Sequence, residues 1–365
     1  MACTSGPGPR QARPRRRPRA AAAAFLGVVF CLALTACAGS TATVAPPTAT
    51  PRPPTETPWP TATFTVAPPP ATATATPSST PDPFAGLTID DLRARTYGAG
   101  ALSVERTLAV TDAFTRTLVS YPSDDLTVYA FVNQPTAPGP HPVVLVLHGY
   151  VNPARYETLA YTTRYADALA RAGYLVLHPN YRNHRPSESG DNRFRVGYAV
   201  DVLNLVGIVR RTAGQGPLAT ADPDKIGLFG HSMGGAIAIR AVTIDPQIDA
   251  AVLYGSSNAD DRLNYERWGG DNGVPELETP DVDLHRISPV HHLARIEAAL
   301  SVHHGDRDAD VPLAWSEDLC ARLEAVGRPA DCFTYPGQGH IFWGEGDALF
   351  MERVTAFFDA ALASP

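Results

Sequence analysis

Six short apolar runs, separated by stretches with a helical pattern, constrain the fold of this chain more than any other feature. Continuously apolar runs of this kind are typical of parallel strands that are buried on both faces of a sheet. Strands that alternate with helices indicate an α/β fold, with a mainly parallel sheet flanked by helices. The runs are Val143–Leu147, Leu175–Leu177, Ile226–Phe229, Ala251–Tyr254, Leu300–His303 and Cys332–Tyr335.

An alternating region, a polar insertion and the helices complete this prediction. Residues 104–132 alternate and are rich in β-formers, with a turn at 122–125, so we expect an antiparallel hairpin or meander before the parallel strands. Residues 256–296 are polar and rich in Gly, Asp and Pro, and we expect them to form an insertion over the strand ends. Helices are predicted at about residues 155–172, 194–212, 233–244, 313–326 and 347–362.

The N-terminal residues have the pattern of an export signal. Residues 1–36 carry six arginines and no acidic residue, and an apolar run follows the arginines. The sequence Leu-Thr-Ala-Cys that ends at Cys37 resembles a bacterial lipobox, in which the cysteine is lipidated and becomes the mature N-terminus. Acyl chains on Cys37 would hold the protein at a membrane surface, so we expect an exported lipoprotein that faces the extracytoplasmic space. The alternatives are an ordinary signal peptide and a twin-arginine signal at residues 15–17, where the usual polar and apolar context is missing.

A segment of Thr, Ala, Pro and Ser separates this signal from the rest of the chain. Such a composition has too little apolar surface to offset the conformational entropy that ordering would cost. Its prolines favour an extended chain of about 3.1 Å per residue. We therefore predict a signal peptide at residues 1–36, a disordered linker that begins with the lipidated cysteine at 37–83, and one globular domain at 84–365.

Charge and motifs exclude several classes of partner. The net charge is −7 and the only basic cluster belongs to the export signal, so nucleic acid is not an expected partner. No dinucleotide- or phosphate-binding motif occurs, so we expect no cofactor. The adjacent histidine pairs at 291–292 and 303–304 poorly match the spacing of metal ligands, so we expect no catalytic metal. The sequence does not determine an oligomeric state.

Two cysteines remain once the signal peptide and the lipidated Cys37 are set aside. Cys320 is expected on a helix and Cys332 at the start of the next strand. In an oxidising compartment, an even pair of this kind predicts a disulfide bridge. Two separate buried thiols are the alternative.

The stretch Gly230-His231-Ser232-Met233-Gly234, between an apolar run and an Ala-rich helical pattern, carries the most chemical information. A sharp turn from strand to helix forces its serine into a strained backbone conformation with Oγ exposed. Small residues two positions before and after keep the strand and the helix from colliding. The pattern predicts that Ser232 is a nucleophile; a purely structural turn is the alternative.

A serine hydroxyl needs a base and an acid that orients the base. With a nucleophile of this type, the acid and then the histidine follow the serine along the chain. His340 follows the last apolar run, so we expect it to take the Ser232 proton and return it to the leaving group.

The acid is expected on the loop after the run at 300–303, which carries three aspartates. We favour Asp308, because we expect Asp306 to cap the turn and Asp310 to face solvent. Asp260 or Asp261, after the preceding run, is a more remote alternative.

Two backbone N–H groups are expected to form an oxyanion hole. One belongs to Met233, which follows the nucleophile, and the other to Tyr150, because Gly149 lets the chain turn into the site. The Tyr150 ring is a candidate wall of the acyl pocket, or else a packing group. The remaining candidates near the site are Trp268 and Trp343, as substrate walls or packing groups, and His148 and His231, as hydrogen-bonded structural groups.

These motifs together resemble the catalytic domain of the prolyl oligopeptidase family and the related dienelactone-hydrolase-like esterases. The resemblance rests on residues 147–149, 230–235, 304–312 and 337–340, and it extends over about residues 100–362. It implies an α/β-hydrolase fold, a triad and acyl transfer through a covalent acyl-serine. Two departures are expected: no propeller domain precedes the catalytic domain, and Ser232 stands where a dienelactone-type enzyme would have cysteine.

Three functions are compatible with the sequence. The first is a serine peptidase that acts on short peptides, and the second is a carboxylic ester hydrolase that acts on small esters. Both use the same triad. The third is a tethered binding protein on a hydrolase scaffold, but its mark would be the loss of a triad member, and none is missing.

Overall fold

The computed structural model describes residues 82–269 and 283–363. The predicted signal peptide, Cys37 and all but the end of the predicted linker lie outside the described residues. In the described part of the chain, no helix combines the length and the apolar character that crossing a membrane requires.

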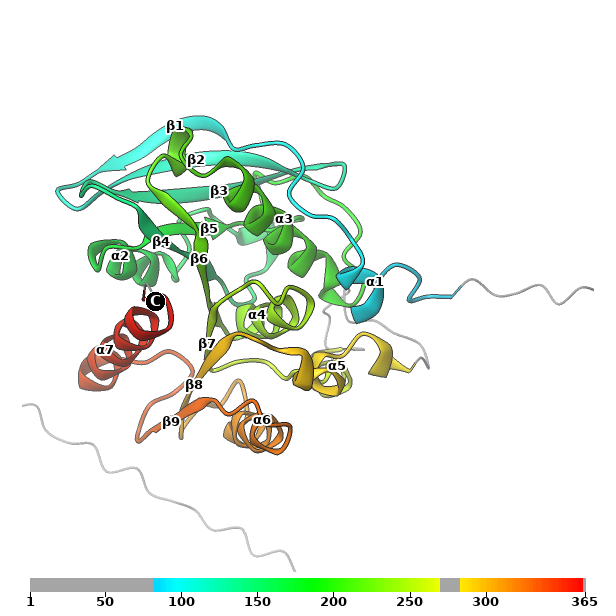
Figure 1. Cartoon of the computed structure of the whole chain (residues 1–365). Helices are drawn as coiled ribbons and strands as arrows, with labels where there is room; N and C mark the ends of the chain where they lie inside the picture. Colours follow the sequence, from blue (N-terminus) through cyan, green and yellow to red (C-terminus); the bar gives the residue numbers. More distant parts are fainter. Residues whose placement is uncertain (1–81, 270–282, 364–365) are drawn as a thin grey trace, which may run out of the picture. The chain divides into compact units, whose positions relative to one another are not determined.

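A nine-stranded sheet forms the centre of the domain, and the α/β prediction is confirmed (Figure 1). The strand order is β1-β2-β3-β5-β4-β6-β7-β8-β9. β1, β2 and β3 form an antiparallel meander, β3 pairs antiparallel with β5, and the other pairs are parallel. The strands span Ser103–Val110, Phe114–Ser123, Leu126–Pro135, His141–Leu147, Leu175–Pro179, Ala221–His231, Ala250–Tyr254, Ala299–Gly305 and Asp331–Tyr335, numbered β1 to β9.

Helices cover both faces of the sheet. Figure 1 shows α2 and α7 on one face, and α3, α4 and α6 on the other. The helices are α1 at Ile89–Arg93, α2 at Thr163–Arg171, α3 at Val196–Thr212, α4 at Met233–Ile244, α5 at Asp261–Trp268, α6 at Leu313–Ala325 and α7 at Gly344–Ala361.

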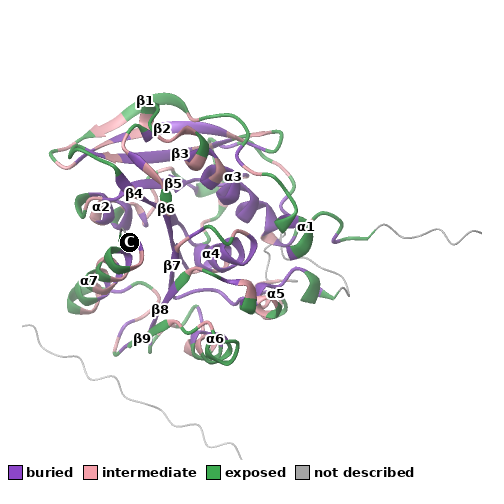
Figure 2. Cartoon of the chain, viewed as in Figure 1, coloured by how far each residue is buried: buried purple, intermediate pink, exposed green. Residues whose placement is uncertain are grey.

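Strand β4 shows why the apolar runs are continuous. Val143, Leu145 and Leu147 pack into the hydrophobic core that also contains α3 and α4. Val144 and Val146 point to the other face, into the core formed with α2 and α7. Because burial of each such side chain contributes about 1.5–3 kcal/mol, both faces of a central strand select apolar residues (Figure 2).

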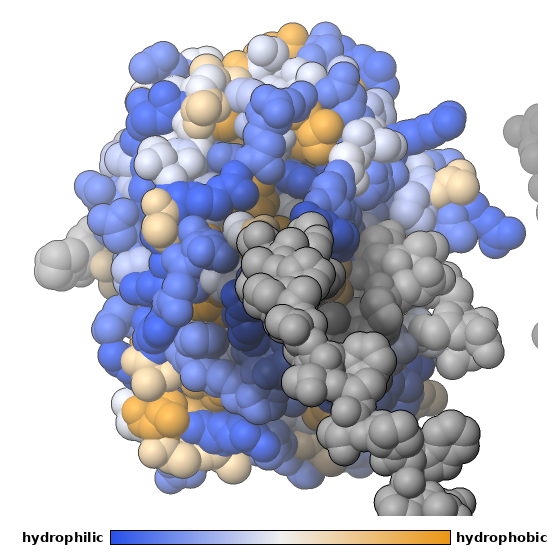
Figure 3. All heavy atoms as spheres, turned by 90° about the vertical axis from the view of Figure 1, so that its right-hand side faces the viewer, coloured by the Kyte–Doolittle hydropathy of each residue, from blue (hydrophilic) through white to orange (hydrophobic). Residues whose placement is uncertain are grey.

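The surface has the opposite character. The face shown in Figure 3 is mostly hydrophilic, and its apolar residues occur in small, separate groups.

Three predicted boundaries were wrong. Helix α2 begins at Thr163 and not near 155, because an irregular loop occupies residues 156–162. Helix α3 begins at Val196, since the two residues before it have left-handed backbones. The hairpin turn consists of Asp124 and Asp125 alone, as β2 extends to Ser123.

Residues 270–282 of the predicted polar insertion lie outside the described residues, and helix α5 anchors the part before them to the domain. The Asp260 side chain caps α5 by accepting the N–H of Arg262 (2.9 Å). Asp261 forms a buried ion pair with Arg240 of α4 (2.6 Å). Burial raises the pKa of Asp261, and the attraction of Arg240 opposes this rise. Both aspartates therefore have structural roles, and neither is the acid partner of His340.

Cys320 of α6 and Cys332 of β9 are joined by a disulfide. They are separated by 12 residues along the chain. Closing a loop of this length contributes about 3 kcal/mol to stability in the chain-entropy model.

Candidate active site

Ser232 occupies the sharp turn between β6 and α4. Its φ of 56° and ψ of −120° are unusual for a residue with a side chain. The chain crosses itself closely here, because a Cβ atom on Gly230 would lie 2.3 Å from the carbonyl oxygen of Gly234. A Cβ atom on Gly234 would lie 2.1 Å from the carbonyl oxygen of Leu147. Glycine is therefore required at both positions.

His340 and Asp308 form a hydrogen-bonded pair. The His340 Nδ1–H donates to Asp308 Oδ2 over 2.7 Å. The Asp308 side chain is fully buried, whereas the His340 side chain keeps 16% of its surface exposed. The backbone N–H groups of Asp310 and Val311 both donate to Asp308 Oδ1, each at 2.9 Å. The carboxylate is thus fixed in place, and the outer edge of the imidazole faces the site.

The surroundings of Asp308 keep it ionised. Burial raises the pKa of this carboxyl, but hydrogen bonds from His304 and His340 outweigh burial and hold the pKa well below its ordinary value. His304 lies 3.2 Å from Oδ2 through its Nε2. The Val311 carbonyl also faces this Nε2 (3.0 Å), so Nε2 carries the proton and Nδ1 accepts the Ser316 hydroxyl over 2.7 Å.

The two neighbouring aspartates differ from Asp308. Asp306 accepts the N–H of Gly337 over 2.6 Å, so it ties the acid loop to the histidine loop. Asp310 is exposed, and it also lines the cavity that contains Ser232. Ligand atoms of Asp308, Asp310 and His340 lie within 4.8 Å of one another, which makes them a candidate cation group. Both Asp308 oxygens already accept hydrogen bonds, however, so the geometry is that of an oriented imidazole.

The loop after β4 lies against the nucleophile. The Gly149 N–H donates to the Tyr161 hydroxyl over 3.0 Å, so this amide is not available to a substrate. A Cβ atom on Gly149 would lie 3.0 Å from the Ser232 Cβ and 2.5 Å from the Tyr161 hydroxyl. The next amide, that of Tyr150, and the Met233 N–H at the start of α4 remain the predicted oxyanion donors.

His231 joins three parts of the site. It accepts the Tyr161 hydroxyl at Nδ1 (2.5 Å) and donates from Nε2 to the His340 carbonyl (2.9 Å). Burial, together with the neighbouring His340 ring, lowers the pKa of His231 to about 3, so the imidazole is neutral. The Gly149 loop, the nucleophile turn and the His340 loop are therefore connected by one chain of hydrogen bonds.

Sequence reasoning missed Tyr161 in this network. Tyr161 lies in the irregular loop before α2, where a helix was expected. Burial raises the pKa of its hydroxyl, which therefore stays protonated and can donate. The only signal in the sequence was its position after a strand end, where parallel strands present their functional loops.

A cavity of about 430 Å³ contains Ser232 and His340. Tyr150 and Trp268 form aromatic walls, which is one of the two roles that the sequence left open for each of them. Trp343 is 70% exposed and does not line the cavity. The remaining lining residues are Met233, Asp310 and two that the sequence did not single out, Arg195 and Ser257.

Two other histidines singled out by the sequence are structural. His148 is buried, and its Nε2 hydrogen-bonds to the Asn180 carbonyl (3.2 Å). Burial lowers its pKa well below the ordinary value. His303 is held between Ser301 and Tyr335, with both hydrogen bonds at 2.8 Å, and burial lowers its pKa to about 3.

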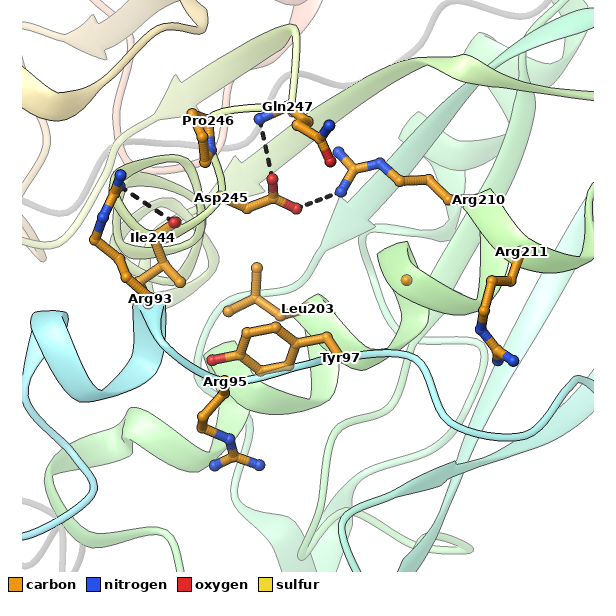
Figure 4. Close-up of a pocket in the computed structure, with 11 residues that line it drawn as sticks. Arg93, Arg95, Tyr97, Leu203, Arg210, Arg211, Ile244, Asp245, Pro246 and Gln247 are labelled. Carbon is orange, nitrogen blue, oxygen red and sulfur yellow. Dashed lines mark hydrogen bonds and ion pairs between the residues drawn. The ribbon is translucent and has the colours of Figure 1, made fainter.

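A second cavity, of about 320 Å³, lies at the other end of α4 (Figure 4). Its charged side chains point at protein groups. Arg93 donates to the Thr243 and Ile244 carbonyls, and Arg210 pairs with Asp245 (2.5 Å). This cavity marks where the segment after α1 docks on the domain.

Comparisons with known proteins find a matching family and several similar proteins. Residues 128–360 match the model of the dienelactone hydrolase family. The chain is 21% identical over 255 residues to a protein named as a carboxymethylenebutenolidase from Synechocystis, which covers 66% of this chain and 91% of that protein.

Peptidases and esterases also occur among the similar proteins. The chain is 26% identical over 242 residues to dipeptidyl aminopeptidase BIII from Pseudoxanthomonas mexicana, covering 62% of this chain but only 34% of that protein. Among solved structures, acetyl xylan esterase 1 from Thermoanaerobacterium superposes with a TM-score of 0.55 at 16% identity, covering 76% of this chain and 91% of that chain. At this identity the likeness shows the fold alone.

Proposed function

The chain belongs to the dienelactone hydrolase family, and on this premise we propose that it is an extracytoplasmic serine hydrolase. It cleaves small ester or short peptide substrates through an acyl-serine intermediate. The observation that carries this proposal is the cavity shared by Ser232, on its strained turn, and by His340, which is oriented by the buried Asp308.

The arrangement supplies each step of acyl transfer. Because His340 donates its Nδ1 proton to Asp308, its Nε2 is available to take the Ser232 proton as Oγ attacks the carbonyl carbon. The Met233 and Tyr150 N–H groups and the N-terminus of α4 stabilise the negative oxygen of the tetrahedral intermediate. His340 then protonates the leaving group, and a water molecule, activated in the same way, releases the acyl group from Ser232.

Ester and peptide cleavage both use this geometry. Likeness to dipeptidyl aminopeptidase BIII favours peptides, but it spans about a third of that protein. Likeness to the carboxymethylenebutenolidase spans most of that protein and favours small esters. We keep ester hydrolysis as the second candidate on that ground. A non-catalytic binding protein is a third candidate, and covalent labelling tests it.

The decisive experiment measures kcat/KM of the full chain on matched p-nitrophenyl esters and aminoacyl p-nitroanilides. Ser232→Ala is the control, and it should reduce activity by at least about 10⁴-fold. Anilide cleavage that is lost in Ser232→Ala would establish a peptidase, and ester cleavage alone would establish an esterase. Failure of a fluorophosphonate to label Ser232 in folded protein would overturn the serine hydrolase proposal.

Export is a separate part of the proposal and rests on the pattern that ends at Cys37. Lipidated Cys37 would anchor the domain, and the linker would hold it away from the membrane. In cells, Cys37→Ala should move the protein from the membrane fraction to the soluble fraction. Unchanged membrane fractionation of the variant would contradict lipid anchoring.

A further inference from the structure

The loop after β7 lies against the nucleophile turn. The Ser232 N–H donates to the Tyr254 carbonyl (2.9 Å), and the Ser257 N–H donates to the Ser232 carbonyl (3.0 Å). The Ser232 carbonyl and the Met233 N–H belong to one planar peptide unit, so the second hydrogen bond also fixes the direction of the proposed oxyanion donor. Ser257 is therefore placed directly beside the nucleophile turn.

Two adjacent serines in this loop differ in the partners of their hydroxyl groups. Both residues are buried, with 4% of Ser256 and 5% of Ser257 exposed. The Ser256 hydroxyl donates to the Ser257 carbonyl (2.7 Å). The Ser257 hydroxyl has no partner among the hydrogen bonds of the residues that the structure describes. A buried hydroxyl without a partner is unfavourable, and Ser257 lines the cavity of Ser232, so we expect its partner to be a molecule bound there.

Ser257 also lines a second, smaller cavity between α4 and α5. This small cavity has a volume of about 20 Å³ and shares Met233 and Ser257 with the active-site cavity. Ala236 and Ile237 of α4 form its apolar wall. A volume of this size has room for about one group as large as a water molecule. The small cavity therefore fits a single small substituent of a substrate bound in the larger one.

Three other polar residues of the small cavity bind groups of the protein. Arg240 pairs with Asp261 (2.6 Å), so their charges compensate each other. Asn264 forms two hydrogen bonds with the Asn258 backbone (2.8 and 2.9 Å). A charged substituent would lose its hydration without gaining an opposite charge, because that pair is already formed. A neutral hydroxyl fits better, since the Ser257 hydroxyl can accept a hydrogen bond from it or donate one to it.

The small cavity lies on the acyl side of the proposed reaction. His340 lines the active-site cavity but not the small cavity. Because His340 would protonate the leaving group, the leaving group must lie near its imidazole. The small cavity begins instead at Met233, whose N–H would bind the carbonyl oxygen. A substituent in it therefore belongs to the acyl portion of the substrate.

We propose that Ser257 is a specificity-determining residue, and that the site selects acyl groups that carry a neutral hydroxyl. The chemical class is a short hydroxyacyl ester or the corresponding amide. The hydroxyl lies on the second or third carbon of the acyl chain, because the small cavity begins beside the group that binds the carbonyl oxygen. This inference rests on the proposed function, because it assumes acyl transfer at Ser232.

The test measures kcat/KM of the full chain on p-nitrophenyl 2-hydroxybutanoate and p-nitrophenyl 3-hydroxybutanoate. Each is compared with the ester in which a methyl group of similar size replaces the hydroxyl, the 2-methylbutanoate or the 3-methylbutanoate. Dividing each ratio by the ratio for hydroxide-catalysed hydrolysis removes the difference in intrinsic reactivity. We expect the hydroxy ester of at least one pair to be preferred by about three- to tenfold, the range for a hydrogen bond between neutral groups. If the chain cleaves anilides alone, p-nitroanilides of the same acids take the place of the esters.

Three variants assign this preference to one hydroxyl. Ser257→Ala should abolish the preference by slowing the hydroxy ester, with hydrolysis of the methyl-substituted ester changed by less than about threefold, because the backbone N–H that binds Ser232 remains. Ser257→Thr keeps the hydroxyl and should retain part of the preference. Ser256→Ala is the matched control, since it removes a buried hydroxyl of the same loop that is bonded to the protein, and it should leave the preference unchanged.

Three outcomes would overturn the inference without touching the proposed function. They are a wild-type chain that shows no preference for the hydroxy ester in either pair, a Ser257→Ala variant that keeps the preference, and a preference that Ser256→Ala also removes. A wild-type chain that cleaves neither esters nor anilides would instead refute the proposed function itself.

Discussion

A cavity lies at each end of helix α4, and the polar groups that line the two cavities have different partners. At the N-terminal end, Ser232 has a strained backbone, and the imidazole of His340 presents its outer edge to a cavity of about 430 Å³. At the C-terminal end, the guanidinium groups around a cavity of about 320 Å³ bind carbonyl and carboxylate groups of the protein itself (Figure 4).

This difference shows how a functional site can be distinguished from a contact between two packed segments of the chain. The last carbonyl groups of any helix have no hydrogen-bond partner within that helix. At the end of α4, Arg93 donates to these carbonyl groups. Gly98 and Gly207 let the segment after α1 cross α3 closely, because a Cβ on Gly207 would lie 2.8 Å from the Gly98 Cα. The cavity at the C-terminal end of α4 has more charged lining residues and a smaller volume than the cavity at the N-terminal end, but neither property identifies a functional site. What separates them is whether the polar groups are directed at the protein or at the cavity.

The largest expected effect tests the proposed catalytic residues at the N-terminal end of α4. Asp308→Asn should reduce kcat/KM by about 10⁴-fold, because the amide cannot stabilise the imidazolium or select the tautomer. Asp310→Asn should reduce it by less than about tenfold on an uncharged ester, since Asp310 does not bond to the His340 Nδ1. Equal losses in the two variants, measured with p-nitrophenyl hexanoate, would show that the acid has been assigned wrongly.

The next effect tests the hydrogen-bond network around His231. Tyr161→Phe removes the acceptor of the Gly149 N–H and the donor to His231, so the loop with the proposed oxyanion donor loses its support. We expect kcat to fall by about ten- to hundredfold with KM nearly unchanged, since the loss falls on the transition state. The control is Tyr97→Phe at the opposite end of α4, whose hydroxyl donates to the Leu92 carbonyl (2.8 Å) and which should leave kcat unaltered.

Acid should destabilise the fold through its buried histidines. The pKa of His231 is lowered to about 3 by burial, while an unfolded histidine titrates near 6.5. Between these values the unfolded chain binds a proton that the folded chain does not, so stability falls as the pH falls from about 6.5. The loss is about 2 kcal/mol for such a group at pH 5.

Urea unfolding of the wild type and of His231→Gln at pH 7 and pH 5 measures this effect. The variant should show a smaller loss of unfolding free energy between the two pH values than the wild type does. An equal loss in both proteins would mean that His231 is not the neutral group that the structure indicates.

The smallest expected effect concerns the cavity at the C-terminal end of α4. Arg93→Met removes the donors to the Thr243 and Ile244 carbonyls, which should lower the unfolding free energy by about 1 kcal/mol. The kcat/KM on any substrate should change by less than about twofold. A large loss of activity with unchanged stability would erase the distinction between the two ends.

Much of the fold followed from local sequence patterns. The alternation of apolar runs and helices predicted the parallel part of the sheet, because a strand buried on both faces has no position for a polar side chain. The glycines around Ser232 predicted the turn between β6 and α4, since only glycine tolerates backbone contacts of 2.1–2.3 Å at its Cβ position. The resemblance to dienelactone-hydrolase-like proteins, carried by the same short motifs, is confirmed by the family match over residues 128–360.

The side chains around these motifs were decided by tertiary structure. The sequence favoured Asp308 among three aspartates within five residues, but only the packing of the loops after β8 and β9 shows that Asp308 is buried against His340. Tyr161 and Arg195 reach the site from an irregular loop and from a pair of left-handed residues, where periodicity predicted helix. Periodic patterns report on burial along a single element. Contacts between segments far apart in the chain depend on how the loops fold over the strand ends, and no single segment encodes that arrangement.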